Sequence, residues 1–165
     1  MRIQLHSPQR RTEGRRATAA VELAVVAPLI AALLVGLLEV GQMVQVNEIL
    51  SNAAREGARK ASTGINTYAD VQTTVANYLT NAGITNQNGL TVTVYDVSQN
   101  NSGPQFNPST AGWLDQLQVT VTLPYSNVQL SPFLTRPTTV MSAQAVWFSN
   151  QDQAYPTTIT PPAGN

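Results

Sequence analysis

Residues 17–41, ATAAVELAVVAPLIAALLVGLLEVG, form an apolar run with no charged side chain between Glu22 and Glu39. An α-helix rises about 1.5 Å per residue, so about 20 residues cross a bilayer core that is about 30 Å thick. The stretch from Ala19 to Val40 is long enough, and membrane helices tolerate a proline such as Pro28 because neighbouring groups satisfy the freed carbonyl. The sequence therefore predicts one transmembrane helix over residues 18–41, in contact with membrane lipid.

Two other interpretations of this run stay open at the level of sequence. A soluble core helix is one, although runs this long and this free of charge are uncommon in a chain of 165 residues. A removable secretory signal is the other, and it requires a small-residue cleavage site after a shorter apolar region. The residues that follow, EVGQMVQVNEIL, contain no such site. The anchor is therefore the favoured interpretation.

The charges beside the run predict how the helix is oriented. Five arginines precede it, against one acidic residue, Glu13. They are Arg2, Arg10, Arg11, Arg15 and Arg16. Because positive residues stay on the cytoplasmic side of a membrane, residues 1–17 are expected to form a cytoplasmic basic leader. The remaining residues then lie outside the cytoplasmic membrane, and the chain crosses it once.

The composition excludes several classes of function. The chain has no cysteine and a single histidine, His6, so disulfides, thiolate chemistry and multi-histidine metal sites are not available to it. A net charge of zero argues against nucleic acid as a partner. Asp96 and Asp115 could face each other across strands, but both are expected at strand ends, where aspartate is usually a turn residue. We therefore predict no catalytic residue, no cofactor and no metal, and a protein that is not an enzyme.

The helical pattern continues beyond the apolar run. A narrow apolar stripe at spacings of three and four predicts an amphipathic stalk helix over residues 42–62. The stripe consists of Val46, Ile49, Leu50, Ala53, Gly57 and Ala61. It ends in alanine and glycine, which suits close approach by another helix or by a sheet. A separate surface helix after an ordinary anchor is the alternative.

The rest of the chain predicts a small extracytoplasmic domain over residues 63–150. A second helix is expected from Tyr68 to about Ala82, with a capping box formed by Thr67 and Asp70. Strands are expected over residues 90–96, 116–123 and 138–149, because the first two alternate between apolar and polar positions. Short loops favour antiparallel pairing. The predicted fold is therefore α+β: a long N-terminal helix, a small helix and a three-stranded sheet. Residues 151–165 lack periodicity and are expected to be disordered.

Two long loops between the predicted strands hold isolated apolar side chains. Phe106 and Trp113 lie in residues 98–113, and Leu130, Phe133 and Leu134 lie in residues 124–137. These side chains are expected to cover the end of the sheet. The alternative for the segment from Leu130 to Leu134 is contact with lipid or with a neighbouring subunit.

The carboxylates at the two ends of the apolar run are candidate functional groups. A carboxylate at the margin of a membrane helix is costly unless it is paired or hydrated. For Glu39, simple placement in the outer headgroup layer is the plain alternative. Glu22 directly follows the basic leader.

The string RRATAAVELAVVAPLIAALLVGLLEVGQM, followed by QVNEILSNAAREGARKAS, resembles the TadE-like family. These are pseudopilin-like proteins of tight-adherence (Tad, Flp-type) pilus systems. The similarity covers residues 15–62 and continues more loosely through DVQTTVANYL and VTVTLPYS. It implies a pilin-like fold and a structural or assembly component of a Tad-type pilus. It also implies partners among pilin-like or TadE/TadF-like subunits and the Tad secretion machinery.

The resemblance also implies processing by a prepilin peptidase, which in this family and in type IV pilins cuts five residues before the glutamate. Counting back from Glu22 makes Thr18 the first mature residue and Ala17 the last residue of the leader. Ala17 stands where the family usually has glycine. A freed amine at Thr18 could be neutralised by Glu22 of its own or a neighbouring subunit, which would fix the axial register of packed helices.

Small residues within the apolar run are expected to let membrane helices approach closely. They are Ala24, Ala27, Ala31, Ala32 and Gly36. The favoured function is thus a membrane-anchored pseudopilin or minor pilin. The alternative is a membrane-tethered extracytoplasmic binding module with no tie to a pilus.

Overall fold

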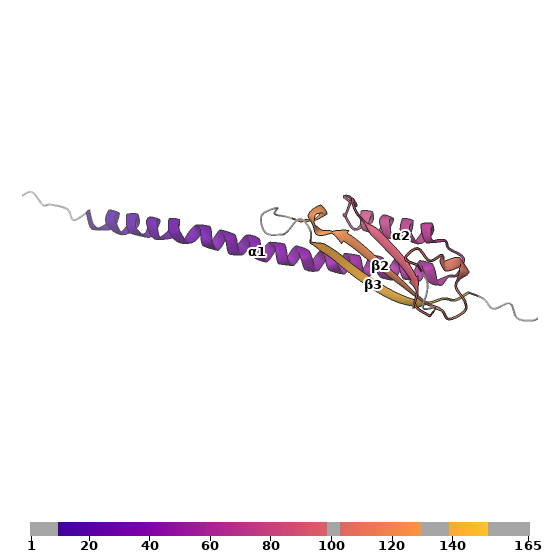
Figure 1. Ribbon diagram of the computed structural model, residues 1–165. Coiled ribbons are helices and arrows are strands. Elements are labelled where there is room, and N and C mark those ends of the chain that lie inside the picture. The colour runs from indigo at the N-terminus through magenta and orange to yellow at the C-terminus, as the bar shows by residue number, and fades with distance from the viewer. Residues whose placement is uncertain (1–9, 99–102, 130–138, 152–165) are drawn as a thin grey trace, which may run out of the picture.

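The chain forms one long helix whose C-terminal half carries a small head (Figure 1). The computed structural model describes residues 10–98, 103–129 and 139–151, with side chains described from residue 17 onward. Helix α1, Arg10–Ser62, has 53 residues and is therefore about 80 Å long. Pro28 lies inside it without ending it. The predicted membrane helix and the predicted stalk are thus two halves of one continuous helix.

The head combines one short helix with an antiparallel sheet, which confirms the predicted α+β fold. Helix α2 spans Tyr68–Asn81. The strands are β1, Thr91–Asp96, β2, Gln116–Pro124, and β3, Val140–Phe148, in the spatial order β1-β2-β3. Both strand pairs are antiparallel. Two short 3-10 helices, η1 at Pro108–Thr110 and η2 at Tyr125–Asn127, flank β2 in sequence.

One face of the sheet packs against both helices and forms the core. The alternation of the strands explains this, because successive side chains of a strand point to opposite faces. The buried side chains of the first two strands are Val92, Val94, Leu117, Val119, Val121 and Leu123. They meet Val46, Leu50, Ala53, Ala54, Ala58 and Ala61 of α1 and Val71, Val75 and Leu79 of α2. The predicted stalk, residues 42–62, is therefore the part of α1 on which the head is built.

Gly57 lies where α1 approaches both α2 and the sheet. A Cβ atom at this position would lie 2.7 Å from Cγ2 of Val75 and 3.2 Å from Cγ1 of Val119. Such distances are shorter than ordinary van der Waals contact. The side chains of the stripe thus become smaller, from valine and leucine to alanine and glycine, because α1 packs closely against α2 and the sheet of the same chain.

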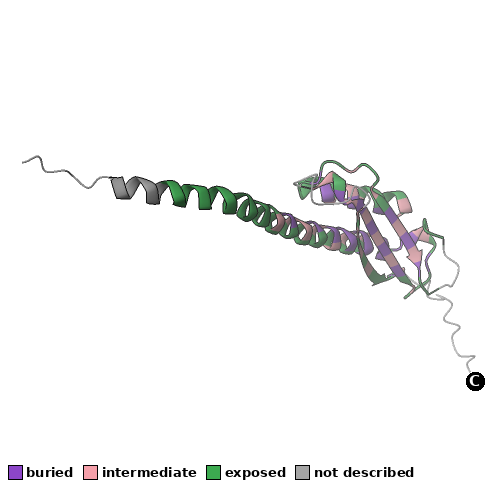
Figure 2. Ribbon diagram, turned by 60° about the vertical axis from the view of Figure 1, so that its left-hand side comes forward, coloured by how far each residue is buried: buried purple, intermediate pink, exposed green. Residues whose placement is uncertain are grey.

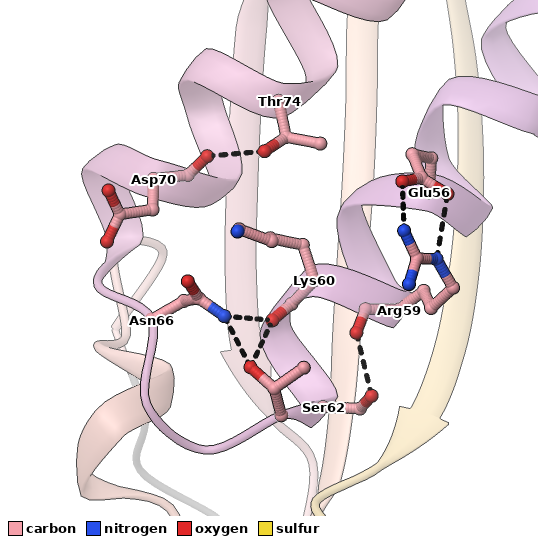
Figure 3. Close-up of polar contacts among 8 residues, drawn as sticks. Glu56, Arg59, Lys60, Ser62, Asn66, Asp70 and Thr74 are labelled. Carbon is pink, nitrogen blue, oxygen red and sulfur yellow. Dashed lines mark hydrogen bonds and ion pairs between the residues drawn. The ribbon is translucent and has the colours of Figure 1, made fainter.

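Polar side chains close the connection between the two helices (Figure 3). The carbonyl oxygen of Lys60 accepts hydrogen bonds from Thr63 Oγ1 at 3.0 Å and from Asn66 Nδ2 at 2.9 Å. These bonds use an acceptor that the last turn of a helix leaves without an intrahelical partner. The backbone N–H of Asn150 donates to Ser62 O at 2.7 Å. The end of β3 is thereby held against the end of α1.

Helix α2 begins as the sequence predicts. Thr67 is the N-cap: its backbone N–H donates to Asp70 Oδ2 at 2.8 Å, and its Oγ1 accepts from Asp70 N at 3.3 Å. This is the predicted capping box with aspartate in place of glutamate. Gly83 follows the helix with φ of 92°, a left-handed conformation that glycine adopts without strain.

The described part of the loop after β1 makes specific contacts with the strand and the core. Val94 forms an isolated parallel bridge with Gln105, which covers the outer edge of β1. Phe106 packs against the core, as expected, whereas Trp113 is 56% exposed and does not cover the sheet. Residues 130–138 and 152–165 lie outside the described part of the chain, so the predictions for Leu130, Phe133 and Leu134 and for the C-terminal tail stay predictions.

Candidate functional site: the apolar half of α1 and its junction with the head

The apolar half of α1 extends away from the head with its side chains uncovered (Figure 2). Within the described residues, one helix is long and apolar enough to cross a membrane, and none of its most apolar stretch is buried. Leu29, Leu33 and Leu37 are each more than 60% exposed. The helix of a soluble core would bury such side chains, because exposing them to water is unfavourable. This segment is consistent with a single-pass membrane anchor.

The two candidate carboxylates lie in different surroundings. Glu22 is exposed, whereas Glu39 is only 3% exposed. Glu39 follows Glu22 by seventeen positions, so they lie about 26 Å apart along the helix axis, close to the thickness of a bilayer core. Glu39 therefore marks the point where the apolar half ends and the contact with the head begins.

Glu39 meets Tyr125 at this point. The Tyr125 hydroxyl donates a hydrogen bond to Glu39 Oε1 at 2.8 Å, and Tyr125 is completely buried. Tyr125 is the first residue of η2, directly after β2, and its backbone N–H donates to Thr139 O at 2.9 Å. The contact thus joins the helix to the end of the sheet that lies nearest the apolar half of α1.

The surroundings of Tyr125 keep its hydroxyl protonated. Burial, followed by the hydrogen bond to Glu39 and the charge of that carboxylate, raises the pKa of Tyr125 from 10.0 to about 12. A neutral phenol can donate a hydrogen bond to a carboxylate, whereas a phenolate cannot. The Glu39–Tyr125 contact therefore persists throughout the neutral pH range.

A second polar contact lies one turn further along α1. Gln42 Nε2 donates to the carbonyl oxygen of Val128, which follows η2. Asn127 Nδ2 in turn donates to Asn88 O at 2.6 Å, ahead of β1. Two successive turns of α1 are thus fastened to the loop after β2. This arrangement fixes the direction in which the apolar half of α1 leaves the head.

The structure distributes the predicted small residues over the apolar half of α1. Ala24, Ala27, Ala31 and Ala32 are exposed, Gly36 is half-buried, and no atom lies within 4 Å of a Cβ built on Gly36. Ala32 precedes Glu39 by seven residues, and Val46 follows Glu39 by seven. Residues seven apart drift by only about 20° around a helix, so Ala32 lies on the side of α1 that bears the head.

The predicted processing residues lie near the other end of the described helix. Ala17 and Thr18 are exposed, and Thr18 precedes Glu22 by one helical turn. The structure does not bring these residues near Glu39 or the head. The predicted role of Ala17, Thr18 and Glu22 in processing stays a prediction.

The aspartates considered as a catalytic pair close separate turns. Asp96 Oδ1 accepts from Ser98 N at 2.9 Å, and Asp115 Oδ2 accepts from Gly112 N at 2.6 Å. Aspartate commonly stabilises turns in this way. Among the described side chains, no three histidine, cysteine, aspartate or glutamate residues are grouped as metal ligands would be.

The sequence marks Glu39 as unusual but does not reveal its hydrogen-bond partner, Tyr125. The two residues of the contact are 86 positions apart. The apolar surroundings of Glu39 indicate an unusual carboxylate, but Tyr125 lies in a polar, proline-containing loop with no distinguishing local signal. Only the return of β2 toward the middle of α1 brings it into place.

Comparison with known families supports the resemblance seen in the sequence. Residues 17–59 match the model of the TadE-like protein family. The match covers the apolar half of α1, the Glu39 junction and most of the helix inside the head. It stops before α2 and the sheet. No curated protein and no solved structure matches the chain.

Proposed function

We propose that this chain is a membrane-anchored pseudopilin or minor pilin that serves as a structural or assembly component of a Tad-type pilus. The observation that carries the proposal is the match of residues 17–59 to the TadE-like family, on a helix whose apolar half is uncovered. That family belongs to pilus systems and is not known for enzymes. The proposed topology is a cytoplasmic N-terminus, a span over residues 18–41 and an extracytoplasmic head.

The proposed work of the protein is helix packing and protein contact. In lipid, helices associate through close van der Waals packing, and small residues permit the backbones to approach. Ala24, Ala27, Ala31, Ala32 and Gly36 supply such surfaces. Proposed partners are pilin-like or TadE/TadF-like subunits, the Tad secretion machinery and a prepilin peptidase.

Deletion of the gene, followed by complementation, tests this function. We expect the deletion to reduce pili on the cell surface, counted by electron microscopy, and the intact chain to restore them. Unchanged pili would contradict the proposal. That result would favour the alternative, a tethered binding module that works without a pilus.

Glu22 tests the proposed mechanism within the membrane. We expect Glu22→Gln to leave the chain in the membrane fraction but to reduce pilus number, because an uncharged side chain cannot neutralise the amine of a neighbouring subunit. Glu48→Gln is the matched control, since Glu48 is an exposed glutamate of the same helix beside the head. Normal piliation with Glu22→Gln would rule out this role of Glu22.

The proposed leader cleavage has its own test. We expect Ala17→Gly to speed the removal of residues 1–17, because glycine is the residue that the family usually has there. Cleavage would shift the chain by about 2 kDa on a gel, as expected for the loss of a short leader. Mass spectrometry of the N-terminus would then find Thr18 first. An uncut N-terminus in both forms, with the peptidase present, would exclude cleavage.

A further inference from the structure

Strand β3 lies at the edge of the sheet, and no described segment pairs with its outer side. All nine of its residues pair with β2 on the inner side. Among the described residues, no backbone hydrogen bond joins the outer side of β3 to another segment. The opposite edge of the sheet differs, because Val94 of β1 accepts from Phe106 N at 3.0 Å and donates to Pro104 O at 3.0 Å. Within the described residues, the edge of β1 is bridged at Val94 and the edge of β3 is not bridged.

The hydrogen-bond pattern identifies which residues face the open side. Thr139 O accepts from Tyr125 N, and Ser149 N donates to Asp115 O, so odd-numbered positions bond to β2. In an antiparallel ladder the bonding residues alternate. The even-numbered residues therefore direct their N–H and C=O groups outward, and all of their side chains are exposed. They are Val140, Ser142, Gln144, Val146 and Phe148.

The open edge lacks the features that usually prevent pairing. Natural edge strands are protected by charged side chains, by proline or by being short. The sequence of β3, VMSAQAVWF, has no charged residue and no proline. Its nine residues exceed the usual strand length of about five or six. A strand of this kind is a template for the addition of another strand.

Large apolar side chains are exposed where β3 ends, at the pole of the head remote from the membrane helix. Trp147 is 43% exposed and Phe148 is 50% exposed. The turn before β2 adds Trp113, 56% exposed, and Leu114, 49% exposed. Leu114 N donates to Ser149 O at 3.0 Å, so this turn adjoins the end of β3. The open edge therefore finishes among exposed apolar side chains, with Trp147 and Phe148 on opposite faces of the strand. Together with Trp113 and Leu114 of the adjoining turn, they are called the apolar cluster here.

Leu114 adopts an unusual backbone conformation. Its φ is 63°, in the left-handed region, at a bulge where Leu114 and Asp115 both bond to Ser149. Glycine is the usual residue at such a position, because a side chain is strained there. The strained backbone holds an exposed leucine and does not serve the core. Strain of this kind is commonly kept where a side chain has a binding role.

The direction of β3 restricts what can occupy the open edge. Tyr125, after β2, lies beside Glu39, whereas Asn150, after β3, bonds to Ser62 at the far end of α1. Both β1 and β3 therefore run away from the membrane helix. Among the described residues, the edge strands that a second copy in the same membrane offers are β1 and β3, and both run in the same direction as β3 here. Antiparallel pairing of β3 with that copy is excluded by the shared anchor.

Parallel pairing of two β3 strands is also disfavoured. In a parallel pair, the bonding residues of one strand lie between those of the other. If a two-fold axis related the two parallel strands, each residue would lie directly opposite the same residue of the other strand. The staggered hydrogen bonding of a parallel pair could then not form. The two copies would have to shift by one residue and lose their symmetry. A second copy is therefore a poor occupant of the edge.

We propose that the open edge of β3 binds an extended, uncharged segment of a different polypeptide, which adds to the sheet as an antiparallel fourth strand. This segment runs toward the membrane. Its N-terminal end lies at the apolar cluster and carries a large apolar or aromatic side chain there. The direction of the segment rests on the membrane anchoring given under the proposed function.

Photocrosslinking along β3 tests the proposal in cells that assemble the native system. A benzophenone amino acid is placed in the full chain at Val140, Gln144 or Phe148, one position at a time. Thr91, exposed on the covered strand β1, is the control position. Mass spectrometry then identifies the residue captured at each site. Only strand addition predicts an ordered series of captured residues.

The expected result is one segment of one other protein captured from all three β3 positions and not from Thr91. The captured residue moves toward the N-terminus of that segment as the probe moves from Val140 to Phe148. The proposal would be overturned by adducts with a second copy or by the absence of any adduct. It would also be overturned by captured residues in the opposite order or in no order. If the chain stays in the membrane fraction, such a result leaves the proposed function standing. A chain found in the soluble fraction would overturn both.

A backbone variant supplies a second test. Gln144→Pro removes an outward N–H while leaving the bonds to β2, because position 144 faces the open side. We expect crosslinking from Phe148 to fall at least about threefold, as the loss of one backbone hydrogen bond predicts. Gln144→Ala keeps the N–H and is expected to crosslink normally. Should the proline variant fail to fold, Gln144→Lys introduces a charge instead. Undiminished capture in a folded variant would overturn strand addition.

Discussion

At the scale of single residues, the contact between Glu39 and Tyr125 is the clearest feature of the molecule. It is a buried hydrogen bond at the place where the apolar helix enters the head. The sequence predicts that Glu39 is special, since it is a carboxylate at the end of an apolar run. It does not predict Tyr125, because their contact depends on the path of a strand 86 residues later.

Removal of the Tyr125 hydroxyl should weaken the head. Tyr125→Phe leaves the buried carboxylate of Glu39 without this donor, which should lower the free energy of unfolding by about 1–3 kcal/mol. Urea unfolding of the full chain in detergent measures the change. Ser126→Ala, at the exposed next residue, is the control. Equal stability of Tyr125→Phe and the parent would contradict the role assigned to this bond.

The same hydroxyl predicts a pH dependence. The folded pKa of Tyr125, about 12, lies above its ordinary value of 10.0. The folded state then binds the proton of this hydroxyl more tightly than the unfolded state does. The resulting stabilisation of the folded state is complete below pH 10.0 and declines as pH approaches about 12. The stability gap between the parent and Tyr125→Phe should shrink over this range. A gap that is constant up to about pH 12 would contradict the shift.

Two glycines of α1 should respond to alanine in opposite directions. Gly57→Ala should destabilise the head by about 1–3 kcal/mol, because its Cβ would press on Val75 and Val119. Gly41→Ala has nothing within 4 Å of the new Cβ and should stabilise the helix by about 0.5–1 kcal/mol. Thermal unfolding of both variants in the same detergent compares them. A similar effect at both positions would refute the packing at Gly57.

At the scale of elements, regular patterns were predictable and irregular ones were not. The alternation in β1 and β2 and the capping signals of α2 locate these elements to within a residue or two. Strand β3 has a less regular pattern because its position at the edge leaves both of its faces partly exposed. The bridge between Val94 and Gln105 was not predicted, since the loop after β1 carries no periodicity and its path is set by tertiary contacts.

The cap of α2 provides a prediction at this scale. The hydrogen bond from the Thr67 backbone, followed by that from its side chain, lowers the pKa of Asp70 below 3.8. Stability from this cap is therefore complete above pH 3.8 and is lost as pH falls through the lowered value. Asp70→Asn should remove this pH dependence, and Asp115→Asn serves as the comparison. Hydrogen exchange in the first turn of α2 measures the loss. Unchanged exchange on acidification would contradict the capping role.

At the scale of the whole molecule, the fold joins a membrane-type helix to a head without an intervening linker. Gln42 fastens the turn after Glu39 to the loop after β2, and α1 enters the core from Val46 onward. The orientation of the head is thus set by the helix that carries it. The sequence predicted the α+β fold and the apolar run. It could not predict that the second half of α1 is the central helix of the head, because an amphipathic stripe does not identify its partner.

The most direct measurement for the whole account is the accessibility of the head in intact spheroplasts. The chain has no cysteine, so Thr73→Cys, on the exposed side of α2, creates a single labelling site. We expect a membrane-impermeant maleimide to label this variant in intact spheroplasts and the labelled chain to stay in the membrane fraction until detergent is added. Labelling that begins only after the spheroplasts are broken, or a labelled chain that is soluble without detergent, would contradict a membrane-spanning helix that holds the head outside.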